Sequence, residues 1–272
     1  MPNATLTALL DDFTTKMRAA IAALPDGVTL FADDFAAGLA RWTDWYQSPG
    51  WIRADAGTLA ITTPAATHGA PTSPIDTTYT HAAIAAAKGV TSTAACVYEA
   101  RVKLVRQTRT GGAGNQPNAW EVPWVMFRFT DERHYYYVHF KAHHLRDMTQ
   151  DYGGIEIGKY NTTTGGLYEA NPGQEVLWNF SAADLRARGV PFDYAANGQW
   201  YDYRIDVRDV PGGVNIIVKL NGVVVANVTD VGNIVAYGHT RPTPPLPAGG
   251  TIALYCEDAD VRFDNVRVTA LG

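Results

Sequence analysis

Residues 122–142 read VPWVMFRFTDERHYYYVHFKA, and this stretch decides the fold class. Two runs of β-branched and aromatic residues flank the polar residues 130–133, a pattern that predicts two antiparallel strands joined by a turn. With Phe129 placed opposite His134, cross-strand neighbours share one face of the hairpin. The face typical of a protein core then carries Val125, Phe127, Tyr136 and Val138.

The opposite face of this hairpin is both aromatic and polar, and it carries Trp124, Met126, Arg128, Tyr135, Tyr137 and His139. Aromatic rings can stack on the C–H faces of sugars while polar tips bind hydroxyl groups, so this composition favours a carbohydrate-binding surface. The alternative is that these rings pack under loops or against a neighbouring chain. The ligand-binding residues we expect are Trp124, Arg128, Tyr135, Tyr137 and His139, with Trp120 and His143 from the adjoining loops.

Composition excludes several classes of partner. The net charge is −5, and Lys and Arg are scattered, so no nucleic-acid partner is expected. No apolar run reaches the length of a membrane span, which predicts no membrane insertion. The first residues lack the basic and apolar regions of a secretory signal peptide.

The cysteines and histidines do not predict a transition-metal site. Cys96 and Cys256 lie in strand-like segments, which favours two buried free thiols, and a disulfide would require their strands to adjoin. The histidines at 134, 139, 143 and 144 are close in sequence, but spacing alone does not make three of them converge on a metal ion. We expect these histidines to be exposed and to form hydrogen bonds.

The N-terminal segment predicts an amphipathic helix over residues 3–25. Its apolar residues recur at alternating spacings of four and three, the pattern of a coiled-coil seam: Leu6, Leu10, Phe13, Met17, Ala20 and Leu24. A helix of this length is marginal alone in water, so the seam must be buried. We expect residues 1–27 to mediate attachment or homo-oligomerisation, with a trimer favoured, and packing on the chain's own domain is the alternative.

Residues 28–272 predict one all-β domain of short strands separated by turn signals. The sequence Asn221-Gly222 is the strongest hairpin signal. A bulge is expected near Asp264-Asn265, because the apolar residues before this point occupy odd-numbered positions and those after it even-numbered ones. Residues 63–93 predict a long loop with a helical turn at 81–88, and residues 181–188 predict a short helix. The remaining strands are expected at 31–35, 58–62, 96–105, 155–160, 200–207, 214–220, 223–228, 251–256 and 261–271.

Several motifs occur in an order that resembles concanavalin A-like lectin/glucanase domains of the laminin G or family-16 type, over about residues 30–271. These are residues 32–35 with Gly38 and Trp42, Trp51 with 57–59, 127–129 with 135–136, 200–201 with 221–222, and 263–266. The resemblance implies a jelly-roll sandwich of two antiparallel sheets with the ligand on the concave sheet. It also implies a structural calcium ion held by positions Asp34, Gly57 and Asp264, whose oxygen donors suit Ca²⁺.

The resemblance does not extend to the catalytic strand of those glucanases, Glu-x-Asp-x-(x)-Glu. The segment 154–158 has one acid, Glu156, and residues 257–260 lie at a strand end. This departure puts glycosidase activity in doubt. Alginate-lyase-like relatives suggest an alternative, in which Arg128, Tyr135, Tyr137 and His139 form a β-elimination site.

A helical seam, the absence of a secretion signal and a lectin-like domain together resemble a bacteriophage virion protein of the minor-tail or receptor-binding type. We therefore expect a non-catalytic carbohydrate-binding subunit of the virion that recognises a cell-surface glycan, with glycan and other virion subunits as partners. The alternatives are a polysaccharide lyase or glycoside hydrolase acting on the same face, and a purely structural virion subunit. A secreted or extracellular location is the alternative to the virion.

Overall fold

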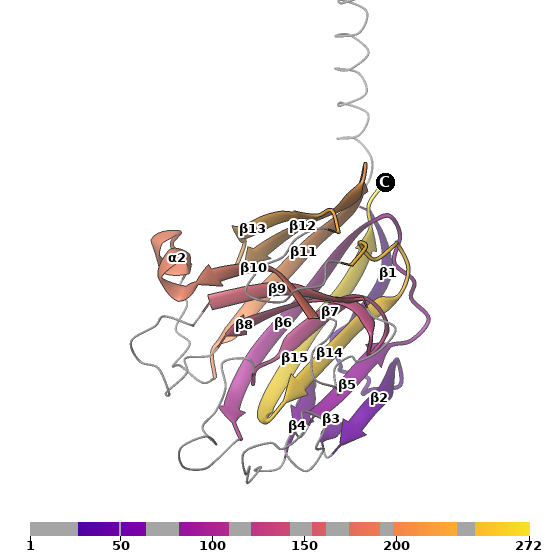
Figure 1. Cartoon of the computed structure of the whole chain (residues 1–272). Helices are drawn as coiled ribbons and strands as arrows, with labels where there is room; N and C mark the ends of the chain where they lie inside the picture. The colour runs from indigo at the N-terminus through magenta and orange to yellow at the C-terminus, as the bar shows by residue number, and fades with distance from the viewer. Residues whose placement is uncertain are drawn as a thin grey trace, which may run out of the picture.

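The structure, a computed structural model, describes residues 27–48, 50–63, 82–108, 121–141, 154–161, 174–190, 198–232 and 243–272. Within these ranges the chain forms two antiparallel sheets and one short helix (Figure 1). The helix expected over residues 3–25 lies outside the described residues. The same is true of Trp120 and His143.

The eight-stranded sheet has the strand order β13-β12-β11-β6-β15-β4-β3, with β1 also paired to β15. Its strands are β1 (Val28–Asp33), β3 (Trp51–Asp55), β4 (Thr58–Thr62), β6 (Ala95–Gln107), β11 (Trp200–Val210), β12 (Gly213–Leu220), β13 (Val223–Asp230) and β15 (Ala259–Ala270). The long strands β6 and β15 lie at the centre of this sheet and pair along most of their length.

The seven-stranded sheet has the order β10-β9-β8-β7-β14-β5-β2. Its strands are β2 (Trp42–Ser48), β5 (Ala82–Ala87), β7 (Trp124–Asp131), β8 (His134–Lys141), β9 (Gly154–Asn161), β10 (Gln174–Ser181) and β14 (Thr251–Glu257). Helix α2 (Ala182–Ala187) follows β10 and lies at the side of the sheets (Figure 1), close to where a short helix was predicted.

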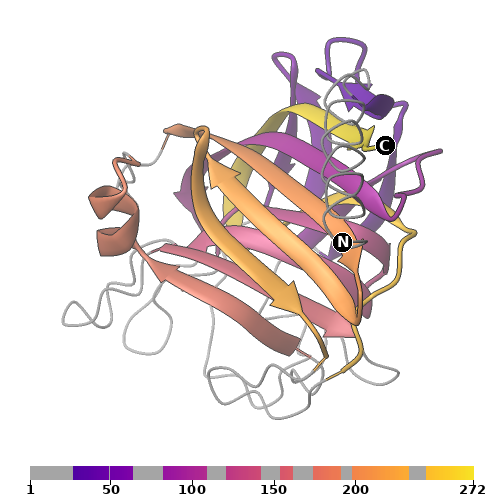
Figure 2. The same ribbon diagram turned by 90° about the horizontal axis from the view of Figure 1, so that it is seen from above.

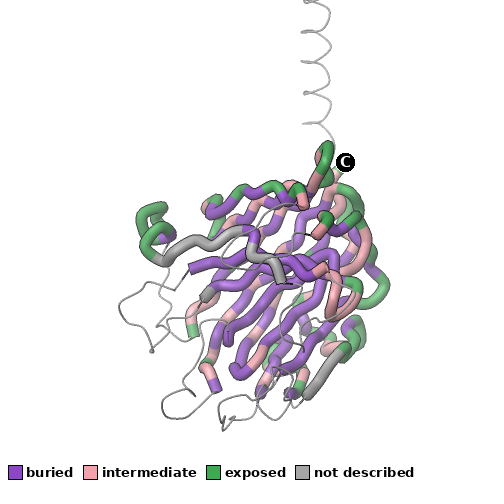
Figure 3. The backbone as a smooth tube through the Cα atoms, in the orientation of Figure 1, coloured by how far each residue is buried: buried purple, intermediate pink, exposed green. Residues whose placement is uncertain are grey.

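The two sheets stack as layers of a sandwich (Figure 2). Ring contacts cross the interface, from Tyr98 on β6 to Phe127 on β7 and from Tyr201 on β11 to Phe140 on β8. Buried residues occupy the middle of both sheets, and exposed residues lie mostly at turns and on α2 (Figure 3). The predicted all-β class and the two antiparallel sheets are therefore confirmed.

Several local predictions from the sequence are also confirmed. Asn221 and Gly222 both have positive φ, at 49° and 82°, as the turn of a tight hairpin requires. Strand β15 changes register between Asp264 and Arg267, which is the expected bulge. Cys96 and Cys256 are buried free thiols, and they lie on strands of different sheets.

The helical turn predicted at residues 81–88 is wrong, because Ala82–Ala87 forms β5 inside the seven-stranded sheet. Strands β14 and β2 pair with its two edges, so both neighbours satisfy its backbone groups. Alanine favours a helix in isolation, but tertiary pairing outweighs that local preference.

The central hairpin has the predicted register at its base, where Trp124 pairs with His139 and Phe127 with Tyr136. The register then shifts, so that Asp131 and not Phe129 pairs with His134. Arg128 has a positive φ of 49°, which marks it as the bulged residue. From Arg128 on, the side chains of β7 exchange faces relative to the prediction, whereas those of β8 keep theirs.

Candidate functional site

Four strands of the seven-stranded sheet place a row of aromatic and ionisable side chains side by side. Glu156 on β9 pairs with His139 on β8, His139 with Trp124 on β7, and Trp124 with Tyr255 on β14. Cross-strand partners point to the same face of a sheet. The alternate residues Phe127 and Phe140 contact Tyr98 and Tyr201 of the eight-stranded sheet, so this row lies on the face turned away from that sheet.

We call this side of the seven-stranded sheet the aromatic face. The side chains that define it alternate with core residues along their strands: Trp124, Phe129, Tyr135, Tyr137, His139, Glu156, Tyr160, Tyr255 and Glu257.

Trp124 is at the centre of the ring contacts on the aromatic face. The His139 imidazole stacks on it with centroids 4.3 Å apart and planes 17° apart. Tyr137 lies against it at 4.6 Å, and Tyr255 meets it edge-on at 5.2 Å. Tyr135 stacks on Tyr160 at 5.0 Å, next to this group. The rings thus hold one another in fixed orientations.

The Glu156 carboxylate lies between a phenol and an imidazole. Tyr137 donates its hydroxyl to Glu156 Oε1 at 2.8 Å, and His139 Nε2 lies 3.6 Å from the same oxygen. His139 Nδ1 lies 3.0 Å from the Phe140 carbonyl oxygen, which only accepts hydrogen bonds, so Nδ1 carries a proton. This contact fixes the ring with Nε2 turned toward the carboxylate. A carboxylate, a phenol and an imidazole are side chains of the kind that general acid–base catalysis uses.

A second phenol–carboxylate pair lies on the other side of Trp124. Tyr255 donates its hydroxyl to Glu257 Oε2 at 2.5 Å. Burial, together with the charges of Glu257 and Glu156, raises the pKa of Tyr160 well above the ordinary tyrosine value. Both carboxylates therefore favour the neutral, hydrogen-bond-donating form of the same phenol.

The side chains of this site are nearly inaccessible to solvent. Trp124 is 5% exposed, His139 1%, Glu156 5%, and Tyr135 and Tyr137 0%. An open stacking surface would leave its rings accessible, so the site is an enclosed one. Burying a carboxylate, an imidazole and phenol groups is costly for stability unless they are hydrogen-bonded, and clusters of such groups are one mark of a candidate functional site.

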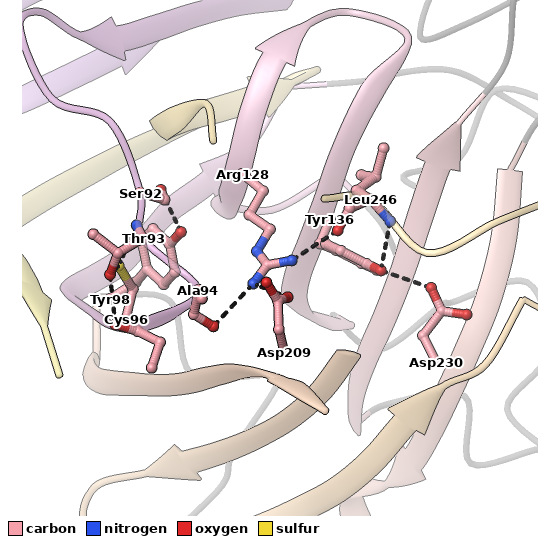
Figure 4. A network of polar contacts seen from close by, with 11 residues as sticks. Ser92, Thr93, Ala94, Cys96, Tyr98, Arg128, Tyr136, Asp209, Asp230 and Leu246 are labelled. Carbon is pink, nitrogen blue, oxygen red and sulfur yellow. Dashed lines mark hydrogen bonds and ion pairs between the residues drawn. The ribbon is translucent and has the colours of Figure 1, made fainter. Parts of the chain in front are cut away.

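Arg128 does not belong to the aromatic face, contrary to the prediction. Its Nη1 donates to the Leu246 carbonyl at 2.7 Å, and its Nη2 pairs with Asp209 Oδ1 on β11 at 2.7 Å (Figure 4). These partners place the guanidinium between the two sheets. The physical cause is the bulge in β7, which turns Arg128 inward and brings Phe129 onto the aromatic face, where it contacts Tyr135.

The structure brings together four of the seven predicted ligand-binding residues, Trp124, Tyr135, Tyr137 and His139. The predicted set lacked Glu156, Tyr160, Tyr255 and Glu257. Alternate residues of one strand, Glu156, Gly158 and Tyr160, share a face with the hairpin aromatics once β9 is paired to β8. That alternation was visible in the sequence, but the pairing was not. The two carboxylates come from different strands, whereas the glucanase motif places its acids on one strand.

The three predicted calcium positions meet at one junction of the eight-stranded sheet. On the same edge of β15, β4 pairs with Asp260–Phe263 and β1 with Val266–Ala270, so both strands end beside Asp264. Asp34 directly follows β1, and Gly57 precedes β4 in a turn. However, Asp34 accepts a hydrogen bond from the Ala36 amide, and Asp264 from Asn265. The junction supplies oxygen donors without a formed coordination sphere.

Over the described ranges, no group of three or more His, Cys, Asp or Glu side chains is arranged to hold a metal ion. Among the same residues, no helix has the length and apolarity needed to cross a membrane.

The fold is a β-sandwich of two antiparallel sheets. Residues 99–269, more than half of the chain, match the 3-keto-alpha-glucoside-1,2-lyase-like domain family, and the chain belongs to this family. No curated protein sequence matches the chain.

Among solved structures, the chain is similar to the exoplasmic/lumenal domain of VIP36. The Ca²⁺-bound form has a TM-score of 0.52 and 9% identity over 90% of each chain, and the Ca²⁺/Man3GlcNAc-bound form has a TM-score of 0.50 and 9% identity over 90% of this chain and 88% of that chain. A sialidase matches at a TM-score of 0.46 and 11% identity over 90% of this chain, which spans only 19% of the sialidase. The likeness to VIP36 shows the fold.

Proposed function

We propose that this protein binds a carbohydrate at the aromatic face. The observation that carries the proposal is the Tyr137–Glu156–His139 group packed against Trp124, because it combines flat rings with hydrogen-bonding groups in one fixed arrangement. Sugar recognition requires this combination, since each pyranose presents both C–H faces and hydroxyl groups. The fold is shared with a VIP36 domain whose structure holds a mannose-containing glycan, which supports the proposal.

Two adjacent tyrosines provide a matched test. Tyr137→Phe removes the hydroxyl bound to Glu156, whereas Tyr136→Phe removes a hydroxyl bound to Asp230 between the sheets. We expect Tyr137→Phe to weaken retention of the full chain by soluble polysaccharides in affinity electrophoresis by about tenfold. Tyr136→Phe should lower stability but leave retention unchanged. Equal retention of both variants and the wild type would place the ligand elsewhere.

We further propose that the protein is a non-catalytic virion component, of the bacteriophage tail or receptor-binding type, that binds a cell-surface glycan. Residues 1–27 would trimerise it or attach it to other virion subunits, so that several weak sites act together. Mass measurement of the full chain in solution, with Leu10→Asp and Met17→Asp as seam-breaking substitutions, tests this part. An oligomer that is unchanged by both substitutions would exclude the seam as its cause.

A second candidate function is enzymatic, as a lyase or hydrolase acting on a glycoside at the same face. The carboxylate between Tyr137 and His139 is suited to proton transfer, and the family description names a 1,2-lyase of 3-keto-α-glucosides. In such an elimination a base removes the C2 proton, which the C3 ketone acidifies. The C1–C2 double bond forms as the C1–O bond breaks, and the leaving oxygen takes a proton.

Product release separates the two candidates. Mass spectrometry of polysaccharides and 3-keto-glucosides incubated with the full chain should show no new product if the protein only binds. Release of a product that stops in Glu156→Gln, while binding persists, would establish the enzymatic function and overturn the non-catalytic proposal.

Calcium at the junction of Asp34, Gly57 and Asp264 is a separate proposal, with a role in holding the chain ends together. It is supported by the register that brings these positions to one place. Thermal unfolding with added CaCl₂ and with EDTA tests it, because a bound ion raises the midpoint through mass action. The rise should be absent in Asp264→Asn, and a midpoint insensitive to both additions would end the proposal.

A further inference from the structure

Trp45 on β2 is an accessible ring at the margin of the aromatic face. Trp45 is 44% exposed, whereas the rings of the aromatic face are nearly fully buried. Its indole meets Phe129 edge-on at a centroid distance of 5.3 Å and an interplanar angle of 87°. Its Nε1 lies 3.5 Å from the Glu132 carboxylate in the β7–β8 turn. Trp45 is thus held by an apolar contact and a polar one while keeping a large accessible surface.

Two independent bulges create this contact. The pairing of β2 with β5 shifts between Asp44 and Tyr46, so Trp45 is the residue at the irregularity. The pairing of β7 shifts at Arg128, which brings Phe129 onto the aromatic face. Bulges redirect side chains and weaken the ladder locally, so they are retained where a side chain must be aimed. Here both redirect rings to one place, although two strands separate β2 from β7.

A continuous series of ring contacts connects Trp45 to the buried site. Phe129 lies 6.0 Å from Tyr135, and Tyr135 lies 6.3 Å from Tyr137, whose hydroxyl binds Glu156. Two rings therefore stand between the indole and Tyr137. Of the rings in this series only the indole is exposed, since Phe129 is 1% and Tyr135 0% accessible. A single sugar ring placed against Tyr137 does not reach the indole, whereas a ligand of several sugar units spans the distance between them.

We propose that Trp45 is the stacking platform of an outer subsite and that the ligand is an oligosaccharide or polysaccharide rather than a monosaccharide. This inference rests on the proposed carbohydrate function. The Glu132 carboxylate beside the indole accepts hydrogen bonds from hydroxyl groups of the sugar unit stacked there. Units bound inside contact the Tyr137–Glu156 group, and the exposed indole binds a unit farther along the chain.

The test compares Trp45→Ala with Trp51→Ala. Trp51 is a similarly exposed indole, 52% accessible, but it lies on β3 of the other sheet. The full chain is first screened by affinity electrophoresis against laminarin, xylan, mannan, dextran and arabinogalactan. Calorimetry then measures affinity for oligosaccharides of increasing length from the polysaccharide that retards the protein.

In the wild type, affinity should rise with length until the outer subsite is filled. Trp45→Ala should remove that rise, with about tenfold weaker binding of long oligosaccharides and unchanged binding of short ones. Trp45→Phe should retain part of the rise, because a ring remains. Trp51→Ala should behave as the wild type, and thermal unfolding should show all three variants folded.

The outcomes separate the two proposals. Suppose that a polysaccharide retards the protein and that affinity rises with oligosaccharide length equally in Trp45→Ala and Trp51→Ala. This result would overturn the outer subsite and leave the carbohydrate function standing. Equal loss of affinity for short and long oligosaccharides in Trp45→Ala would also overturn it, because the indole would then serve the inner site. No retardation by any of the five polysaccharides counts against both proposals.

Discussion

The ring of Tyr137 lies directly over Gly158 on the neighbouring strand. A Cβ added at Gly158 would stand 2.1 Å from both Cζ and the hydroxyl oxygen of Tyr137. The missing side chain is what lets this ring lie across β9 and reach Glu156, two residues along the same strand. A glycine inside a strand commonly marks such a close approach.

Gly158→Ala should therefore displace Tyr137 and break its hydrogen bond to Glu156. We expect a loss of about 1–3 kcal/mol in the free energy of unfolding and weaker polysaccharide retention. Urea denaturation checks the first effect. In a Tyr137→Ala background the same substitution should cost much less, since the clash is gone. Additive costs in the double variant would mean that the ring does not lie over Gly158.

Lys159 and Asp230 form an ion pair between the sheets in which both side chains are fully buried, with a distance of 2.9 Å. Asp230 also accepts the Tyr136 hydroxyl at 2.7 Å (Figure 4). Lys159→Met leaves this carboxylate without its cation, and we expect it to cost about 3–5 kcal/mol. Lys219→Met, at a more exposed pair with Asp206, should cost less than about 1 kcal/mol. Similar unfolding midpoints for the two variants would contradict the burial of the pair.

Arg128 should behave as a structural residue. Arg128→Leu leaves the Leu246 carbonyl and Asp209 without their partner, and a loss of about 1–3 kcal/mol is expected. Protein that remains folded should bind polysaccharide as the wild type does, because the guanidinium lies between the sheets. Stability measured by urea unfolding and binding measured below the unfolding midpoint distinguish the two roles. Lost binding with unchanged stability would return Arg128 to the ligand site.

Stability should fall in alkaline solution because of buried tyrosines. Burial, the leading cause in each case, raises the pKa of Tyr98, Tyr136, Tyr160 and Tyr203 in the folded chain. In the unfolded chain these phenols ionise near pH 10. The folded state then binds more protons than the unfolded state, so the stabilisation is fully present below about pH 10 and is lost as pH rises further.

The urea midpoint, measured from about pH 8 to about pH 11, checks this expectation. Tyr203→Phe is the informative variant because Tyr203 is 2% exposed and its hydroxyl is buried without a hydrogen-bond partner in the described structure. Its pH dependence should be shallower, while stability at neutral pH stays equal or rises. An unchanged slope would show that other groups cause the alkaline loss.

Local sequence patterns were sufficient for the elements whose geometry is decided by near neighbours. Strands were predicted at residues 96–105 and 200–207, where β6 and β11 lie, and the Asn221-Gly222 turn needed only two residues tolerant of positive φ. The parity change around Asp264 was enough to place a bulge in β15. In each case the information lies within a few residues of the feature.

Tertiary structure decided what depends on partners far along the chain. Ala82–Ala87 is a strand because β14 and β2 pair with it, although its composition favours a helix. Arg128 turns inward because a bulge and a carboxylate on β11 hold it there. Glu156, Tyr255 and Glu257 join the hairpin aromatics only through strand pairing. A sequence records which residues share a strand face, but cross-strand register is set by the packing of the whole sandwich.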